Sequence, residues 1–165
     1  MDVERLGETM RACAETPAKA KRNGAEMGHT LVTIKVENVA DWMAAPEKQG
    51  RRRARIRTII IPDALVDTGT TYLCLPSRSI KELGLKPFPR TISATTATGI
   101  VERRLFGGAM VTIEGRSDIF AVAELPDGAP ALVGVIPLEG LDYMVDPTTQ
   151  TLVGKHGAKR IMLMY

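Results

Sequence analysis

The sequence predicts an all-β fold, and three observations support that prediction. Short runs of β-branched and aliphatic residues recur along the chain, and turn-forming segments rich in Gly, Pro and Asp separate them. Helical patterns are confined to one or two short segments. The length of 165 residues is that of a single domain of ordinary size, which is large enough for one hydrophobic core.

The first half of the predicted domain contains three strands and one helix. A bend or edge irregularity is expected where Pro62-Asp63 interrupts the second strand, because proline cannot donate a ladder hydrogen bond. Pro76 ends the third strand, and a helix is expected to follow, with Ser77 as its cap and Gly84 as its stop. The predicted strands are residues 31–36, 56–66 and 72–75, and the predicted helix is residues 77–83.

The second half is predicted to consist mainly of hairpins. The first hairpin joins residues 91–95 to residues 100–105 through a three-residue loop, Ala97-Thr98-Gly99. The remaining predicted elements are a hairpin of residues 108–114 and 117–122 turning at 114–116, a loop at 126–130, a helical turn at 137–141, and strands at 143–147 and 151–153.

The most informative feature of the chain is the tripeptide Asp67-Thr68-Gly69, which follows the apolar residues of the second strand. A carboxylate among aliphatic neighbours is costly to desolvate unless turn N–H groups and threonine hydroxyls donate hydrogen bonds to it. Gly69 permits a positive φ and leaves the backbone close to the acid. The tripeptide therefore indicates a turn that presents an acid for chemistry. A structural Asx-type turn is the alternative that these residues leave open.

A second segment, Leu132-Val133-Gly134, places an apolar pair directly before a glycine, and Pro137 then lies in the first turn of a short helix. This segment, following the Asp-Thr-Gly tripeptide in that order, resembles the retropepsin-like (clan AA) aspartic proteases, and specifically their small single-domain prokaryotic members. The resemblance covers about residues 31–153. It implies a closed acid-protease half-barrel with one or two short helices that is active as a homodimer.

The resemblance also implies a mechanism. Because the Asp-Thr-Gly tripeptide occurs once, a homodimer is expected in which the two Asp67 side chains meet at the twofold axis. Two carboxylates a few ångströms apart share one proton. The ionised carboxyl group activates a water molecule, and the protonated one polarises the scissile carbonyl. The expected function is therefore that of an aspartic endopeptidase that hydrolyses a peptide or protein substrate without a cofactor or metal.

The family pattern assigns roles to the neighbouring residues. Thr68 matches the threonine that grips the opposite subunit's loop, and Thr70 places a hydroxyl where it favours the charged carboxylate, so an acidic activity optimum is expected. Thr98 and Gly99 lie at the tip of the hairpin that matches the flap over the substrate. The implied site residues are catalytic Asp67, the loop residues Thr68, Gly69 and Thr70, the flap residues Thr98 and Gly99, and the supporting turn Leu132, Val133 and Gly134.

The predicted domain has a segment on each side. Residues 1–30 form an N-terminal extension or linker with a short amphipathic helix, and residues 31–153 form the protease domain. Residues 154–165 end in an apolar strand-like tail, which is either a sticky edge or part of the dimer interface. No long apolar run is present, so we expect a cytoplasmic protein that does not enter a membrane.

Charge, cysteine and histidine content exclude several function classes. The net charge is +3, and the run of arginines at residues 51–53 has no aromatic residue interleaved with it, so a solvated loop is favoured over a nucleic-acid site. Cys13 and Cys74 are too few for a disulfide framework and lack metal-ligand spacing. His29 and His156 are isolated in the sequence, so no catalytic triad is predicted.

The sequence also has features of two rival functions. The Asp-Thr-Gly-Thr-Thr sequence also resembles the phosphate loop of the actin and heat-shock-chaperone ATPases, but that fold needs two large lobes and further nucleotide-binding motifs that this chain lacks. The stronger rival is a catalytically silent retropepsin-like module used for dimerisation or peptide binding, because a fold and its activity can separate.

Overall fold

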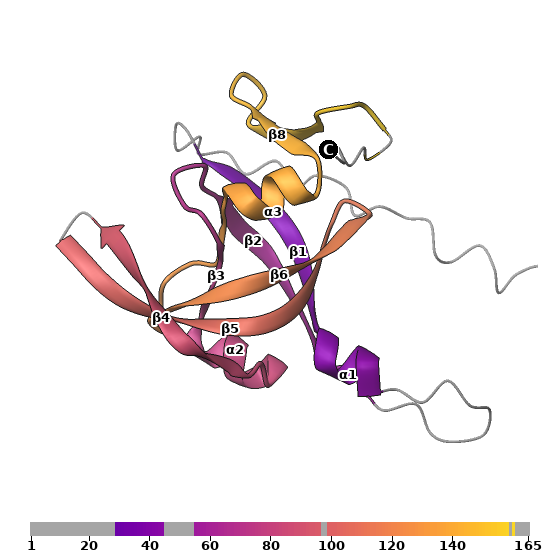
Figure 1. Ribbon diagram of the computed structural model, residues 1–165. Helices are drawn as coiled ribbons and strands as arrows, with labels where there is room; N and C mark the ends of the chain where they lie inside the picture. The colour runs from indigo at the N-terminus through magenta and orange to yellow at the C-terminus, as the bar shows by residue number, and fades with distance from the viewer. Residues whose placement is uncertain (1–28, 45–54, 97–98, 159, 161–165) are drawn as a thin grey trace, which may run out of the picture.

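Strands dominate the structure, which Figure 1 shows as a computed structural model that describes residues 29–44, 55–96, 99–158 and 160. The prediction of an all-β fold is therefore confirmed. None of the helices in these ranges combines the length and the apolar character that crossing a membrane requires. The elements in chain order are β1 (Thr30–Asn38), α1 (Val39–Ala44), β2 (Thr58–Val66), β3 (Leu73–Pro76), α2 (Ser77–Leu83), β4 (Pro87–Thr96), β5 (Gly99–Ile113), β6 (Arg116–Leu125), β7 (Leu132–Val133), α3 (Val135–Gly140), β8 (Tyr143–Asp146) and β9 (Thr151–Gly154).

Most strands belong to one sheet. It has seven strands in the order β1-β2-β7-β3-β6-β5-β4, and β1 pairs additionally with β5. The pairings thus run in a ring from β1 through β2, β7, β3, β6 and β5 back to β1, with β4 outside it. β8 and β9 form a separate two-stranded sheet. In Figure 1, α3 and β8 lie over one end of the main sheet, and α1 and α2 lie at the opposite end.

The hydrophobic core is formed by the inward faces of these strands together with α2 and α3. In β1 the alternate residues Val32, Ile34 and Val36 are buried, as expected for a strand with one face in the core. Ile80 and Leu83 of α2 join the same cluster. A second, smaller cluster is separate from the core and consists of buried Cys74, Leu105 and Ala123 with Tyr72, Ile92, Leu125 and Leu132 packed against them.

The predicted irregularity in the second strand is present. The register between β1 and β2 shifts between Val32 and Ile34. The Thr33 hydroxyl opposite this shift donates to the Pro62 carbonyl oxygen at 3.2 Å. β2 nevertheless continues as one strand through Pro62, because the proline lies where the ladder already lacks a regular hydrogen bond. The strand therefore leads without interruption to Asp67.

Residues 100–105 and 108–114, which the sequence assigns to two different hairpins, belong to one strand of 15 residues, β5. Its N-terminal part pairs with β4, and its C-terminal part pairs with β6 and β1. The register with β6 shifts between Phe106 and Ala109, where Gly108 has a positive φ of 43°. Because of this bend, one strand can pair with β4 in the hairpin and with β6 and β1 in the ring of strands.

Both hairpin turns are shorter than the sequence predicts. Ile113 pairs with Arg116, so the turn consists of Glu114 and Gly115, whose φ values are 45° and 86°. Two consecutive residues with positive φ match the twist of the flanking strands, which favours this tighter turn. In the first hairpin Thr96 pairs with Gly99, so the loop is residues 97–98 and not the predicted three residues.

Helix α2 covers the predicted residues, but the assignment of Ser77 as its cap is wrong. Pro76 occupies the N-cap position, and the Ser77 hydroxyl bonds instead to Glu124 Oε1 on β6 at 2.8 Å. The sequence could not show this partner because it comes from a distant strand. Gly84 ends the helix in the left-handed conformation, φ 62°, as predicted. Helix α1 was not predicted, and none of its residues is buried.

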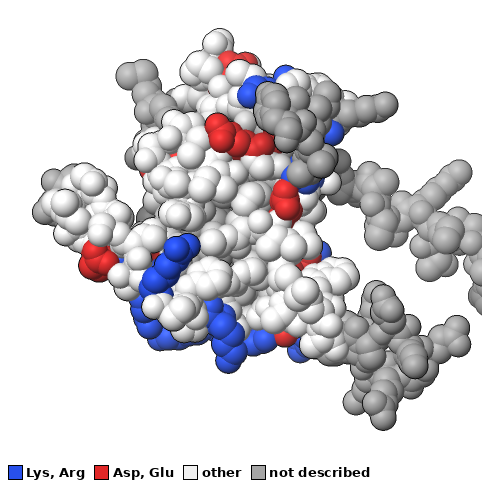
Figure 2. All heavy atoms as spheres, viewed as in Figure 1, with Lys and Arg blue, Asp and Glu red and all other residues white. Residues whose placement is uncertain are grey.

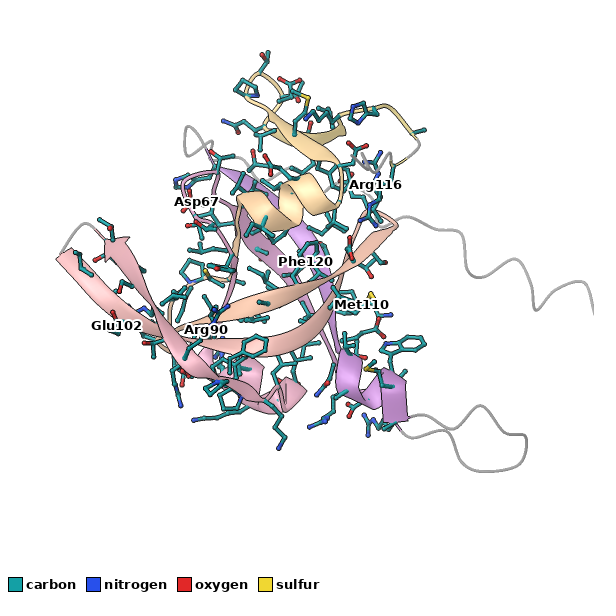
Figure 3. All side chains as sticks on the ribbon, in the orientation of Figure 1. Asp67, Arg90, Glu102, Met110, Arg116 and Phe120 are labelled. Atoms are coloured by element: carbon teal, nitrogen blue, oxygen red, sulfur yellow. The ribbon has the colours of Figure 1, made fainter. Side chains whose placement is uncertain are left out.

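The β8–β9 hairpin and the end of α3 are tied to the turn between β5 and β6 by one arginine. Arg116 Nη1 donates to the carbonyl oxygens of Leu141 and Asp142 at 3.0 and 2.5 Å, and Nη2 donates to that of Gly157 at 2.5 Å. Its guanidinium also lies 4.6 Å from the centre of the Tyr143 ring. Figure 3 shows Arg116 at the end of the molecule where α3 lies.

Several predicted features fall outside the described residues. These are the amphipathic helix within residues 1–28, the arginine run at residues 51–53, the flap residue Thr98 and the apolar tail at residues 161–165.

Candidate active site

Asp67 directly follows β2, and the short strand β7 fixes its position. β7 lies between β2 and β3 and pairs in parallel with β2, with Val66 opposite Val133. The Asp67 N–H donates to the Val133 carbonyl oxygen at 3.0 Å. The backbone of the acid is therefore held by the sheet, and its side chain begins where the regular pairing of β2 ends. Figure 3 shows Asp67 near the end of the sheet that α3 covers.

Each oxygen of the Asp67 carboxylate accepts a hydrogen bond from its own turn. The Gly69 N–H donates to Oδ1 at 2.9 Å, and the Thr70 hydroxyl donates to Oδ2 at 2.7 Å. The Asx-type turn that the sequence left open is thus present. Each oxygen retains capacity for a second donor, because a carboxylate oxygen has two lone pairs. Asp67 is half-buried, and Thr68 and Gly69 are exposed, so the loop remains accessible.

The predicted supporting turn is in contact with this loop through Gly134. The N–H groups of Val135 and Ile136, which follow it, donate to the carbonyl oxygens of Thr70 and Thr71 at 2.8 and 3.0 Å. A Cβ atom on Gly134 would lie 2.5 Å from the Thr70 carbonyl oxygen. Only glycine therefore allows the two segments to approach this closely.

A groove of about 730 Å³ adjoins the Asp67 loop. Its size falls within the range of known ligand-binding clefts. One wall is the loop itself, and the opposite wall is the β4–β5 hairpin. The lining residues are Gly69, Thr70, Thr71, Tyr72 and Cys74, residues 92–96, Arg103, and Ala123, Glu124, Leu125 and Leu132.

Only part of the predicted site lines the groove, and Asp67, Thr68 and Gly134 lie outside its lining. Gly69, Thr70 and Leu132 line the groove, whereas Val133 is buried in the core. Gly99 is described but does not line the groove. From the predicted flap hairpin the groove receives residues 92–96 and Arg103 instead, and neither was singled out from the sequence.

Cys74 lies inside the groove. Burial raises the pKa of its thiol to about 11; the negative charge of Asp67 adds to this rise, and the positive charge of Arg103 opposes it. Asp67 and Arg103 are therefore both close enough to Cys74 for their charges to act on it.

We expect the Cys74 thiol to resist alkylation in the folded protein. With a pKa of about 11 against the ordinary 9.0, its thiolate fraction at pH 8 is roughly a hundred-fold lower than that of a free thiol. Iodoacetamide labelling at that pH, followed by peptide mass spectrometry of the Cys74 segment, measures the rate. The same chain in denaturant is the reference, and equal rates in the two states would contradict the buried position.

The threonine hydroxyl on Asp67 gives a second expected result. Thr70→Val removes the donor at 2.7 Å while keeping the side-chain shape, and we expect any turnover that depends on Asp67 to fall roughly ten-fold, because the carboxylate is held less firmly. Thr70→Ser keeps a hydroxyl and should retain most of the activity. Steady-state kinetics of both variants measure the effect. Equal rates for the two variants would show that the hydroxyl does not position the acid.

Sequence reasoning missed a charged cluster below α3. Asp142, which is 4 % exposed, contacts Arg116 Nη1 at 3.2 Å and His156 Nδ1 at 2.6 Å through its carboxylate. No sequence pattern points to this cluster, because its three residues are far apart in the chain and come from different elements. The cluster holds the β8–β9 hairpin in place. Among the residues that the structure describes, no group of three His, Cys, Asp or Glu side chains is arranged to hold a metal ion.

No protein-family model matches the chain, and no curated protein matches it.

Proposed function

We propose that this protein is an aspartic endopeptidase that hydrolyses peptide bonds with a water molecule activated by Asp67 and the Asp67 of a second copy. One observation carries the proposal. A half-buried, hydrogen-bonded carboxylate stands on a loop locked by Gly134, beside a groove of ligand-binding size. A purely structural Asx turn explains the two hydrogen bonds. It does not explain why the Gly134 backbone packs so closely against residues 70–72, or why a groove lies beside the loop.

The fold supports this assignment. The ring of strand pairings fits the half-barrel of the retropepsin-like proteases, and the insertion of β7 between β2 and β3 holds the Asp67 loop and the Gly134 turn against each other. The β4–β5 hairpin takes the place of the flap, since it forms the wall of the groove that faces the loop.

The proposed catalytic unit is a homodimer. One chain supplies one such carboxylate, and the mechanism needs two. Thr68 is exposed on the loop, as the role of contacting the second copy requires. When two Asp67 side chains approach within a few ångströms, they share one proton. The ionised carboxylate then takes a proton from the attacking water, and the protonated one donates a hydrogen bond to the scissile carbonyl oxygen.

Thr70 and Gly69 have distinct tasks in this scheme. Their donor groups occupy one lone pair on each oxygen of Asp67, which fixes the carboxylate plane and leaves the other lone pairs for the water and for the second copy. The tetrahedral intermediate then collapses when the leaving nitrogen accepts a proton from the carboxyl pair.

The proposal is tested with purified protein and a mixed peptide library between about pH 4 and pH 7. Cleavage by the wild type and none by Asp67→Asn supports it. No cleavage by wild-type protein that is shown to be a folded dimer would overturn it and would favour a catalytically silent peptide-binding or dimerisation module. Equal cleavage by both proteins would exclude Asp67 as the catalytic acid.

A further inference from the structure

Arg103 lies on the face of the β4–β5 hairpin that borders the groove. It pairs across the hairpin with Ile92, so both side chains stand on the same face of the two strands. Ile92 packs against the small cluster of Cys74, Leu105 and Ala123. Leu105 follows Arg103 by two positions on β5 and shares its face for the same reason. The guanidinium is therefore brought to the groove by the strand and not by a free loop.

No carboxylate of the described residues neutralises this guanidinium. Within the part of the chain that the structure describes, Arg103 forms no hydrogen bond or ion pair, although it is half-buried. Four other arginines each hold a carboxylate: Arg57 with Asp41, Arg104 with Glu124, Arg116 with Asp142, and Arg160 with Asp118. A half-buried arginine whose guanidinium has no anion is suited to pairing with an acidic ligand.

Glu124 lines the same groove, but its carboxylate is already bound by Arg104 and Ser77. Arg104 donates to both of its carboxylate oxygens at 2.7 Å, and the Ser77 hydroxyl adds a third hydrogen bond at 2.8 Å. The hydrogen bonds from Arg104, and to a lesser degree that from Ser77, lower the pKa of Glu124. Arg104 and Glu102 belong to the opposite face of β5 from Arg103. The Glu124 carboxylate is therefore paired with Arg104 and forms no ion pair with Arg103.

The rest of the groove would seat an extended chain around this charge. Apart from Glu124, the other side chains that line it are apolar or carry a hydroxyl or thiol group, and they include Ile92, Ala94, Leu125 and Leu132. Figure 2 shows Lys and Arg side chains gathered in the part of the visible face where Figure 1 has α2, β4 and β5. The exposed cations of these elements and the loop between them include Lys81, Lys86, Arg90 and Arg104.

We propose that Arg103 is a specificity-determining residue that selects substrates with an Asp or Glu side chain at the position lying against Cys74 and Ile92. This inference rests on the proposed peptidase function and names the substrate class of the same groove. The guanidinium would form a charge-assisted, bidentate pair with the substrate carboxylate in a partly desolvated site.

The test uses short peptides with amidated C-termini in which each position in turn carries Glu or Gln. At about pH 6 a Glu side chain in a peptide is ionised. At one position of the peptide, we expect the kcat/KM of the wild-type protein for Glu to exceed that for Gln roughly ten-fold or more. A ratio of this size is typical of a hydrogen bond to a charged group. A preference that appears only when the C-terminal amide is replaced by a free carboxylate would overturn the side-chain assignment.

Variants of two arginines sharpen the test. Arg103→Gln should reduce the Glu-to-Gln ratio to about one, and Arg103→Glu should favour Lys over Gln at the same position. Because each ratio is taken within one variant, a general loss of activity does not affect it. Arg90→Gln is the matched control, because Arg90 is exposed on β4 and does not line the groove. This control should keep the wild-type ratio.

Binding of the same peptides to Asp67→Asn separates this inference from the proposed function. Cleavage without any Glu preference overturns the role of Arg103 and leaves the peptidase intact. An Arg103-dependent preference in binding, with no cleavage by the wild type, overturns the peptidase and retains the acidic ligand. Neither cleavage nor a binding preference overturns both.

Discussion

Asp67→Asn is expected to lower peptide turnover roughly a thousand-fold or more, because an amide can neither accept the proton of the attacking water nor share a proton with the second copy. The fold should persist. The amide oxygen can still accept the Gly69 N–H that now donates to Oδ1, and the amide nitrogen can donate to the Thr70 hydroxyl oxygen. Steady-state kinetics and thermal unfolding of the same preparation measure the two effects separately.

A matched control for this substitution is Asp146→Asn. Asp146 also accepts hydrogen bonds from its own turn, from the Thr148 N–H at 2.8 Å and the Thr149 hydroxyl at 2.9 Å, but it lies on the β8–β9 hairpin outside the groove. Its replacement should leave turnover near the wild-type value. If both variants lost activity to the same degree, the effect of Asp67→Asn would be structural and the catalytic role would fail.

Gly134→Ala is expected to impair both stability and activity. The new Cβ would lie 2.5 Å from the carbonyl oxygens of Thr70 and Tyr72 and 2.8 Å from the Thr71 carbonyl carbon. These are backbone atoms of the loop that carries Asp67, so relief requires that the loop move. We expect a loss of about 2–3 kcal/mol in the free energy of unfolding, typical of overpacking. A displaced acid should also lower kcat/KM roughly a hundred-fold.

Urea unfolding and steady-state kinetics check the prediction, with Gly107→Ala as its control. The nearest atom to a Cβ on Gly107 is in the Phe88 ring at 3.4 Å, an ordinary contact with a side chain that can adjust. That variant should remain within about 1 kcal/mol of the wild type. A Gly134→Ala protein as stable and active as the wild type would show that the tight approach does not position Asp67.

Features set by neighbouring residues were predictable from the sequence. Strand β1 follows from its alternating pattern, and the end of α2 follows from Gly84, which adopts the left-handed conformation that glycine permits. The Asp67 turn is equally local, because its two donors, Gly69 and Thr70, lie within three positions of the acid. In each case the sequence itself brings the interacting groups together.

Features that depend on register between distant segments were not predictable. The Ser77 hydroxyl binds Glu124, a partner from β6, and so does not cap its own helix. His156, isolated in the sequence, meets Asp142 only because the β8–β9 hairpin folds back on itself. Arg103 is one of several arginines in the sequence, and only its pairing with Ile92 shows that it lies on the groove face.

The central claim is that one active site needs an Asp67 from each of two copies, and co-refolding wild-type protein with Asp67→Asn tests it most directly. When the chains exchange freely, many wild-type chains enter mixed dimers that hold a single carboxylate. At equal amounts the total activity should fall to about half that of the same wild-type protein refolded alone, and it should fall further with excess variant. Total activity that stays unchanged at every ratio would contradict a shared pair of carboxylates.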